Sequence, residues 1–188
     1  SDLQPDESGT PKLQAILETA LMDMISNDKA QDAVIAQNEA QRRSMWARRE
    51  AAAEITVGFP GAVDTDVAVP LEAVPSFLKQ ITARVQKIDP EGYEFYLSHL
   101  GDGNLHYTFY PSNPSGRFKE PITEAIEDVV LGLQGSFSAE HGIGLSKRNS
   151  MARRKDPVAL EMMRAIKTAL DPKNLMNPGK VYPEPEAR

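Results

Sequence analysis

The stretch that most constrains this chain is a candidate β-hairpin that carries two of its three histidines, His99 and His106. The flanking residues 93–98 and 107–110 are rich in aromatic side chains and largely alternate, as strands do. Between them, Asp102-Gly103 is a favoured pair for the centre of a two-residue turn. Such a turn sets His99 directly opposite His106, with Cβ atoms about 4.5–5.5 Å apart on one face. The sequence therefore predicts two imidazoles within reach of one metal ion.

The third histidine belongs to residues 140–144, Glu-His-Gly-Ile-Gly. Two histidines leave a metal site short of ligands, and Glu140 offers a hard oxygen donor. His141 would then stand beside the ion with a free ring nitrogen, as a histidine base requires. A plain structural interpretation is also open, because half-exposed histidine pairs and Asp-Gly turns occur without function. The grouping of all three histidines in two short motifs favours metal-assisted chemistry.

Composition narrows the function classes. The chain has 188 residues, enough for one domain to bury a core, and its net charge of −6 argues against a nucleic-acid binder. It has no cysteine, which excludes disulfides, thiolate metal sites and cysteine nucleophiles. No apolar run approaches the ~20 residues of a membrane span, and no signal-peptide pattern opens the chain. We therefore expect no membrane span and a cytoplasmic location.

Helical periodicity surrounds the hairpin on both sides. Apolar residues that repeat at helical spacing predict helices over residues 11–24, 29–55, 70–85, 122–133 and 157–170. A short strand is expected over 65–69, a second one follows residue 135, and the basic run 151–156 is expected to be exposed.

These elements predict an α+β fold, an antiparallel sheet covered by helices. We expect residues 1–10 to form a flexible lead-in, residues 11–181 a single domain and residues 182–188 a tail.

The histidine motifs carry a family resemblance. His-x-Gly-Asp-Gly-Asn-x-His at 99–106 and the Glu-His-Gly-Ile-Gly motif at 140–144 resemble the C-terminal domain of FAD-linked oxidases of the vanillyl-alcohol oxidase superfamily. The branch is that of the D-lactate, glycolate and D-2-hydroxyglutarate dehydrogenases. Supporting stretches lie at 46–50, 66–70 and 170–180, and the resemblance extends from about Pro11 to Val181. It implies a ferredoxin-like cap domain that presents substrate and metal to FAD.

The resemblance also implies roles for individual residues. His99, His106 and Glu140 would hold a divalent zinc, manganese or iron ion, and His141 would be the catalytic base. Three further residues would bind small molecules: Arg49 and Asn104 the substrate, and Asn177 the FAD. From spacing alone, the favoured interpretation is structural: Trp46 is a core residue, and Arg49 lies beside it and pairs with nearby glutamates.

The partners follow from the same resemblance. The substrate would be a small 2-hydroxy acid, and an N-terminal domain that this chain lacks would hold most of the FAD, so the isolated chain would be inactive. An exposed sheet edge would also favour a homodimer. Two other classes stay open: a metal-binding module without redox chemistry, and a metal-dependent hydrolase or lyase with the same ligands.

Three positions depart from the family pattern where substrate is selected. The family often has lysine, serine and asparagine where this chain has Asp64, Ala68 and Thr108. The loss of a cation and the gain of a carboxylate disfavour a dicarboxylate such as 2-hydroxyglutarate. We therefore expect a hydroxy acid that is small, or that has an uncharged or aryl tail.

Overall fold

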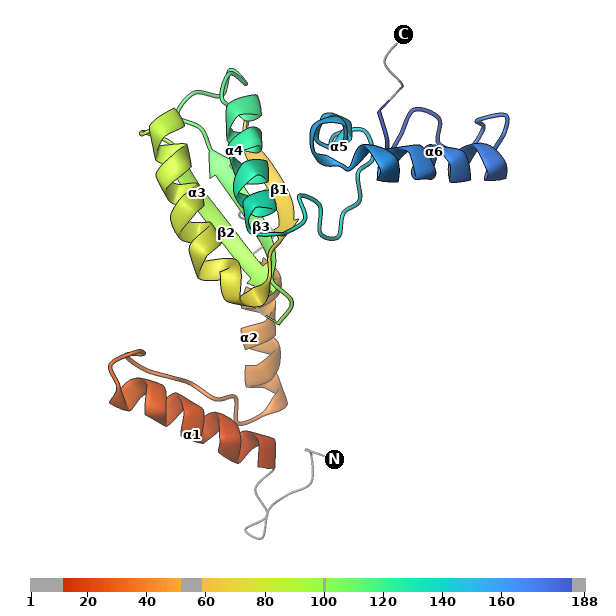
Figure 1. The fold of residues 1–188 in the computed structure, drawn as a ribbon. Coiled ribbons are helices and arrows are strands. Elements are labelled where there is room, and N and C mark those ends of the chain that lie inside the picture. The colour runs from red at the N-terminus through yellow and green to blue at the C-terminus, as the bar shows by residue number, and fades with distance from the viewer. Residues whose placement is uncertain (1–11, 52–58, 100, 184–188) are drawn as a thin grey trace. The chain divides into compact units, whose positions relative to one another are not determined.

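The computed structural model describes residues 12–51, 59–99 and 101–183. The chain divides into two compact units, Ser1–Val57 and Gly58–Arg188. The described part of the first unit has two helices, α1 (Lys12–Ser26) and α2 (Glu39–Ala51), coloured red and orange in Figure 1. The expected helix over 29–55 begins only at Glu39, because the side chain of Asn38 accepts a hydrogen bond from the Gln41 amide and caps the helix there.

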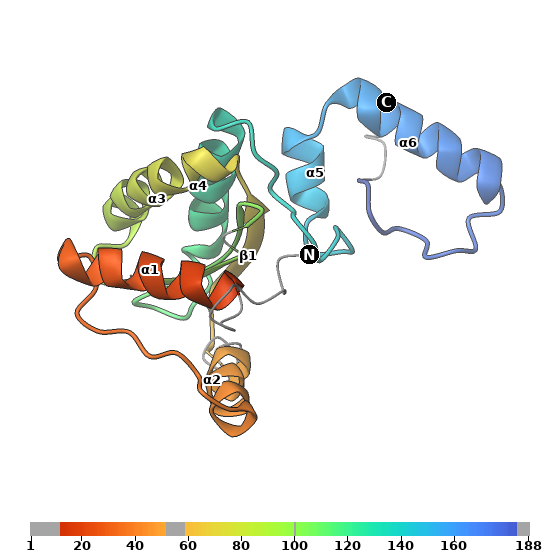
Figure 2. The ribbon, with the colours of Figure 1, turned by 90° about the horizontal axis from the view of Figure 1, so that it is seen from below.

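The second unit is built on a three-stranded antiparallel sheet. Its strands are β1 (Val63–Ala68), β2 (Tyr93–His99) and β3 (Asn104–Tyr110), in the order β1-β3-β2. Helices α3 (Val74–Ile88) and α4 (Lys119–Gly132) lie side by side over one face of this sheet (Figures 1 and 2). A short 3-10 turn, Leu71–Ala73, precedes α3. The prediction of an α+β fold with an antiparallel sheet is confirmed.

The order β1-α3-β2-β3-α4 matches the first five elements of the ferredoxin-like β-α-β-β-α-β motif. The last element of that motif is the strand that the sequence analysis expects after residue 135. The structure reduces it to a single bridge between Ser136 and Ala68, on the free edge of β1.

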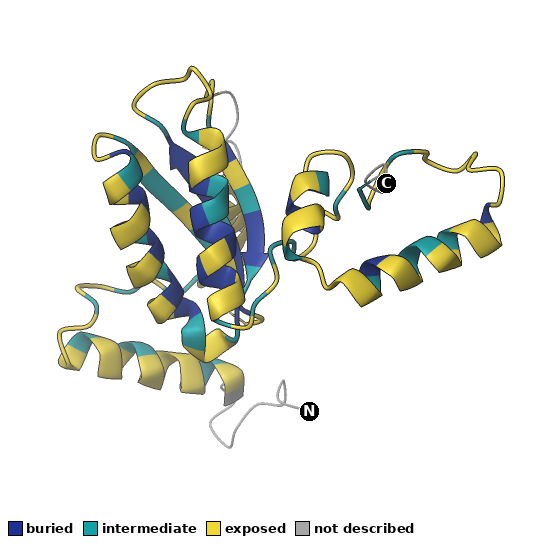
Figure 3. Ribbon diagram, turned by 45° about the horizontal axis from the view of Figure 1, so that its top comes forward, coloured by how far each residue is buried: buried dark blue, intermediate teal, exposed yellow. Residues whose placement is uncertain are grey.

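The core lies between this sheet and the two helices, and Figure 3 shows it as the dark blue inner faces. Alternate residues of β3 point into it, while α3 and α4 contribute apolar side chains at helical spacing. The fully buried members are Tyr107, Phe77, Phe109, Ile81, Leu105, Ile122, Ile126, Val67, Val85, Val129 and Val130.

Two helices follow the sheet. Helix α6 (Pro157–Leu170) has the predicted bounds, because Asp156 caps it and Pro157 occupies its first turn. Residues Arg148–Arg154 form α5, although the sequence analysis expected an exposed run there. Met151 is buried, and Arg154 pairs with the buried Glu127 of α4, so the basic residues of α5 serve an internal contact.

The hairpin forms, but its predicted register is wrong. His99 pairs with Asn104, and His106 lies opposite Leu97, so the last pair of the hairpin is His99 with Asn104. The Asp102 carboxylate accepts the Asn104 amide, and the carbonyl of Gly103 accepts a hydrogen bond from Val69, just beyond β1. A Cβ on Gly103 would lie 2.1 Å from the Val69 oxygen, so this close approach requires glycine.

In the part of the chain that the structure describes, no helix combines the length and apolar character needed to span a membrane.

Candidate metal centre and active site

The candidate site lies on the sheet face that α3 and α4 leave uncovered. Because directly paired residues share a face, Asp66, His106 and Leu97 form one row across the three strands. Ala68, Asn104 and His99 form the next row. His99 and His106 are therefore diagonal neighbours, whose Cβ atoms lie farther apart than those of an opposed pair.

The two imidazoles nevertheless converge. The Nε2 atoms of His99 and His106 lie 3.3 Å apart, with ring planes at 81°. Glu140 approaches from a separate segment, and its Oε1 lies 2.8 Å from His106 Nε2 and 3.9 Å from His99 Nε2. The side chain of His99 is 42% exposed, that of His106 29% and that of Glu140 44%. The structure thus brings together the three residues expected to be ligands, on a side open to solvent.

This donor set fits a divalent metal ion. One ligand atom from each of the three residues lies within 4.8 Å of the others. Two neutral imidazoles and a carboxylate suit zinc, manganese or iron, and three protein ligands leave coordination positions for a substrate.

A buried carboxylate holds the Glu140 segment against the sheet. Asp66 has a side chain only 2% exposed, and its Oδ1 accepts hydrogen bonds from the backbone amides of Ala139 (2.6 Å) and Glu140 (2.9 Å). Its Oδ2 accepts the Lys147 ammonium at 2.7 Å and the His141 amide at 3.3 Å. Burial alone would raise the pKa of Asp66, but these hydrogen bonds outweigh it and hold the pKa below its usual value.

His141 lies beside the cluster. Its ring stacks on that of His106, with centroids 5.5 Å apart and planes at 27°. Its Nδ1 lies 3.2 Å from Asp66 Oδ2, and its Nε2 lies 3.8 Å from Glu140 Oε1. The His141 side chain is 66% exposed, so a ring nitrogen is accessible for proton exchange with a bound molecule.

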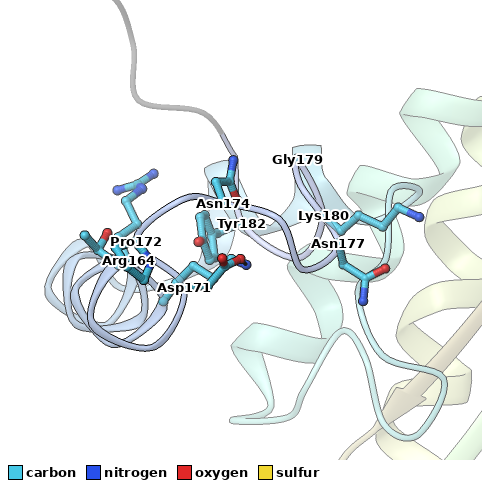
Figure 4. A pocket seen from close by; sticks show the side chains of 10 residues that line it. Arg164, Asp171, Pro172, Asn174, Asn177, Gly179, Lys180 and Tyr182 are labelled. Carbon is cyan, nitrogen blue, oxygen red and sulfur yellow. Dashed lines mark hydrogen bonds and ion pairs between the residues drawn. The ribbon is translucent and has the colours of Figure 1, made fainter.

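The three other candidates lie in different places. Asn104 is buried in the row of His99, and its Oδ1 has no hydrogen-bond partner among the residues that the structure describes. Asn177 adopts a positive φ of 46° and lines a hollow of about 250 Å³ that Figure 4 shows, between α6 and the segment after it. Arg49 belongs to α2 of the first unit. Trp46, expected to be a core residue of the same helix, is 53% exposed.

The sequence analysis did not assign a role to Asp66 or Lys147. One signal for Asp66 is its place in the expected strand, directly before the apolar residues 67–69, where a carboxylate needs buried partners. Lys147 carries no local signal, since its partner lies 81 residues away along the chain.

Comparison with known proteins matches residues 4–181 of the chain to the family described as FAD linked oxidases, C-terminal domain. The D-2-hydroxyglutarate dehydrogenase of Stutzerimonas stutzeri (strain A1501) is 34% identical over 158 residues, which are 80% of this chain and 33% of that protein. The probable mitochondrial D-lactate dehydrogenase of Danio rerio is 34% identical over 152 residues, 78% of this chain and 30% of that protein.

The glycolate oxidase subunit GlcD of Escherichia coli (strain K12) is 33% identical over 165 residues, 86% of this chain and 33% of that protein. The chain therefore spans about a third of the length of the curated relatives it matches.

Proposed function

Because this chain belongs to the family of C-terminal domains of FAD-linked oxidases, we propose that it is the substrate- and metal-binding part of an FAD-dependent enzyme. The reaction would be the oxidation of a small D-2-hydroxy acid of the D-lactate or glycolate type. The observation that carries the proposal is the convergence of His99, His106 and Glu140 on the open face of the sheet. The printed names of the relatives, which include a D-lactate dehydrogenase and a glycolate oxidase subunit, support the reaction class.

We assign the three converging side chains as ligands of a divalent zinc, manganese or iron ion. Such an ion supplies Lewis-acid polarisation, which lowers the pKa of a substrate hydroxyl. The exposed side of the cluster leaves room for the hydroxyl and carboxylate oxygens of a 2-hydroxy acid. Glu140 also contributes negative charge, which partly neutralises a dication next to two neutral imidazoles.

His141 is assigned as the general base. It would accept the hydroxyl proton at a ring nitrogen, and FAD, when bound, would supply the two-electron redox chemistry of the reaction. The exposure of its side chain, 66%, permits contact with a substrate.

Arg49, Asn104 and Asn177 are assigned as binding residues. Asn104 pairs with His99 across the hairpin, and its buried Oδ1, without a described partner, is an unsatisfied acceptor beside that histidine. The guanidinium of Arg49 suits bidentate binding of a carboxylate. Asn177 is proposed to contact FAD from the loop after α6.

Two of the three departures from the family pattern, Asp64 and Thr108, are in direct contact in this structure. Thr108 lies opposite Asp64 in the β1–β3 register, and its hydroxyl donates to Asp64 Oδ1 at 2.7 Å. A carboxylate held in this way repels a second carboxylate on a substrate tail. We therefore propose that the enzyme prefers a monocarboxylate to 2-hydroxyglutarate.

A separate FAD-binding domain would complete the enzyme, and the isolated chain would bind metal without turnover. The edge strands β1 and β2 of the described sheet offer surfaces through which a homodimer is proposed to form. We propose the cytoplasm as its location.

Metal binding is tested by calorimetry with zinc and with manganese on this chain. His99→Ala and Glu140→Gln are expected to weaken binding at least 10-fold. A matched control is Glu91→Gln, which changes an exposed carboxylate in the turn between α3 and β2 and should leave the affinity unchanged. Equal affinities for Glu140→Gln, Glu91→Gln and the unmodified chain would refute the ligand assignment.

The reaction is tested after fusion to an FAD-binding domain from an FAD-linked oxidase. D-lactate or glycolate should then reduce a dye acceptor, and His141→Ala should abolish the reduction. Metal binding without any dye reduction by the folded, FAD-loaded fusion would instead favour a metal module or a metal-dependent hydrolase or lyase.

The substrate preference is tested in the same fusion. The double change Asp64→Lys with Thr108→Asn replaces a carboxylate by a cation. It should raise kcat/KM for D-2-hydroxyglutarate relative to D-lactate by roughly 10-fold or more, because one favourable charge contact corresponds to about 1–3 kcal/mol. An unchanged ratio would show that these positions do not select the substrate.

A further inference from the structure

Asp66 contacts the segment that carries Glu140 through both oxygens of its carboxylate. Five donor groups lie around these two oxygens. Two backbone amides lie on Oδ1, while the His141 amide, the His141 Nδ1 and the Lys147 ammonium lie around Oδ2. The Asp66 carbonyl also accepts a second bond from the Ala139 amide, at 3.1 Å. Three successive amides of residues 139–141 therefore point at one side chain.

This contact fixes the segment opposite His106. Asp66 and His106 are register partners in β1 and β3, so a segment bound to Asp66 runs directly beside the His106 imidazole. The Glu140 carboxylate reaches His106 from there, and the His141 ring stacks on it. The positions of Glu140 and His141 thus both depend on the carboxylate of Asp66 in β1.

Lys147, which follows Glu140 and His141 in the sequence, contacts the same carboxylate. Its ammonium contacts Asp66 Oδ2 and donates to the Ser138 hydroxyl at 2.8 Å, and that hydroxyl donates to the Gly142 carbonyl at 3.1 Å. The lysine side chain is 19% exposed and supplies the positive charge that a buried carboxylate requires.

The same carboxylate defines the state of the His141 ring. An ionised carboxylate accepts hydrogen bonds and donates none, so Asp66 Oδ2 at 3.2 Å favours the tautomer in which Nδ1 carries the proton. In the neutral ring the lone pair is then on Nε2, the nitrogen on the side of Glu140. Metal-bound and catalytic histidines in proteins are commonly oriented by a carboxylate in this way.

We infer that Asp66, supported by Lys147, is the positioning residue of this site: it places Glu140 against His106 and keeps the Nε2 atom of His141 free to accept a proton. The inference rests on the proposed function in that it takes His141 as the base. It adds that the base and one ligand depend on a residue that contacts neither metal nor substrate.

Asp66→Asn tests this inference in the intact chain. In the unmodified chain two donors face Oδ1 and three face Oδ2. In Asp66→Asn an NH2 group replaces one of these oxygens, so in either orientation of the amide it faces donors and cannot accept their hydrogen bonds. Zinc affinity measured by calorimetry should fall about 10- to 100-fold, as is typical when an outer partner of a ligand is lost. The 15N signals of His141, one of only three histidines, should shift from the Nδ1-protonated tautomer to a mixture.

The matched control is Asp89→Asn. Asp89 is also buried, also accepts a backbone amide and a hydroxyl, both from Ser112, and lies at the end of α3. It should cause a similar loss of stability without changing zinc affinity or the His141 tautomer. If Asp66→Asn folds and behaves as Asp89→Asn does in both readouts, the inference is wrong.

Lys147→Met provides a second variant in case Asp66→Asn does not fold. It keeps the carboxylate but removes the cation, and it should weaken zinc binding several-fold with the same direction of change in the His141 signals. Unchanged values in both measurements would overturn the inference. The tautomer is measured without zinc, so an unmodified chain that binds no zinc would refute the proposed function and leave the positioning role decided by the tautomer alone.

Discussion

The two faces of β3 show opposite uses of one strand. Leu105, Tyr107 and Phe109 point into the core and are fully buried, while His106, between the first two, points to the open face and remains half-exposed. The core face is stabilised by apolar contacts, which are non-directional and do not depend on individual hydrogen bonds. The open face is held by a few directed polar contacts around Asp66, which confer little stability but set the geometry of a site.

The largest effect is expected on the core face. Leu105→Ala removes a fully buried side chain opposite Val67 and should lower the free energy of unfolding by about 2–5 kcal/mol. Urea denaturation followed by circular dichroism measures this loss. A loss below about 1 kcal/mol would mean that the core collapses around the cavity and that the face is less tightly packed than the structure indicates.

His106, next to Leu105 in the sequence, should matter little for stability and much for metal binding. His106→Ala should change the stability of the metal-free chain by less than about 1 kcal/mol, because the side chain is half-exposed. The zinc affinity of His106→Ala should nevertheless fall by roughly 100-fold, the upper end of the loss typical of an outer partner. Comparable stability losses for Leu105→Ala and His106→Ala would remove the distinction between the two faces.

Alkaline pH should weaken the core face selectively. Burial raises the pKa of Tyr107, and the carboxylate of Glu94, which accepts its hydroxyl hydrogen, raises it further. Because the folded phenol has the higher pKa, its stabilising contribution is complete below the unfolded value of about 10 and is lost as the pH rises above it.

The free energy of unfolding should fall by about 1 kcal/mol between pH 10 and pH 11 because of Tyr107. Urea unfolding of the unmodified chain and of Tyr107→Phe at both pH values isolates it, since other tyrosines and lysines titrate in both proteins. Parallel pH profiles of the two proteins would show that Tyr107 ionises as readily in the folded chain as in the unfolded one.

The smallest effect is expected on the outer surface of the helices that cover the core. Arg84 of α3 and Asp128 of α4 form an ion pair of 3.4 Å, with both side chains about half-exposed. Arg84→Gln should cost only about 0.2–1 kcal/mol of unfolding free energy, and less at high salt. A larger, salt-independent loss would indicate that the pair helps to hold α3 against α4.

Local patterns in the sequence were sufficient for several elements. The bounds of α6 followed from helical periodicity and from Asp156-Pro157 at its start. The alternation of aromatic residues indicated both strands of the hairpin, and the grouping of the histidines indicated which side chains converge. The signals for α6 and for the two strands lie within a few residues of the elements that they predict.

Other features depended on contacts that are distant in sequence. Helix α5 was missed because the partner of its arginines, Glu127, belongs to α4 and has no local signature. The hairpin register was wrong because the turn preference of Asp102-Gly103 competes with the hydrogen bond that Gly103 accepts from Val69. A turn is favoured by only a small free energy, so a packed strand edge decides between registers.

The sequence by itself determined the chemistry available to this protein: three histidines, one adjacent glutamate and no cysteine, in an α+β pattern that its family shares. Only the tertiary structure decided how those groups meet. The imidazoles of His99 and His106 converge along a diagonal, and Asp66 binds amides that lie 73 to 75 residues away. The reason is physical, because periodicity and capping are short-range properties of the chain, whereas a buried carboxylate takes whichever donors the folded core brings to it.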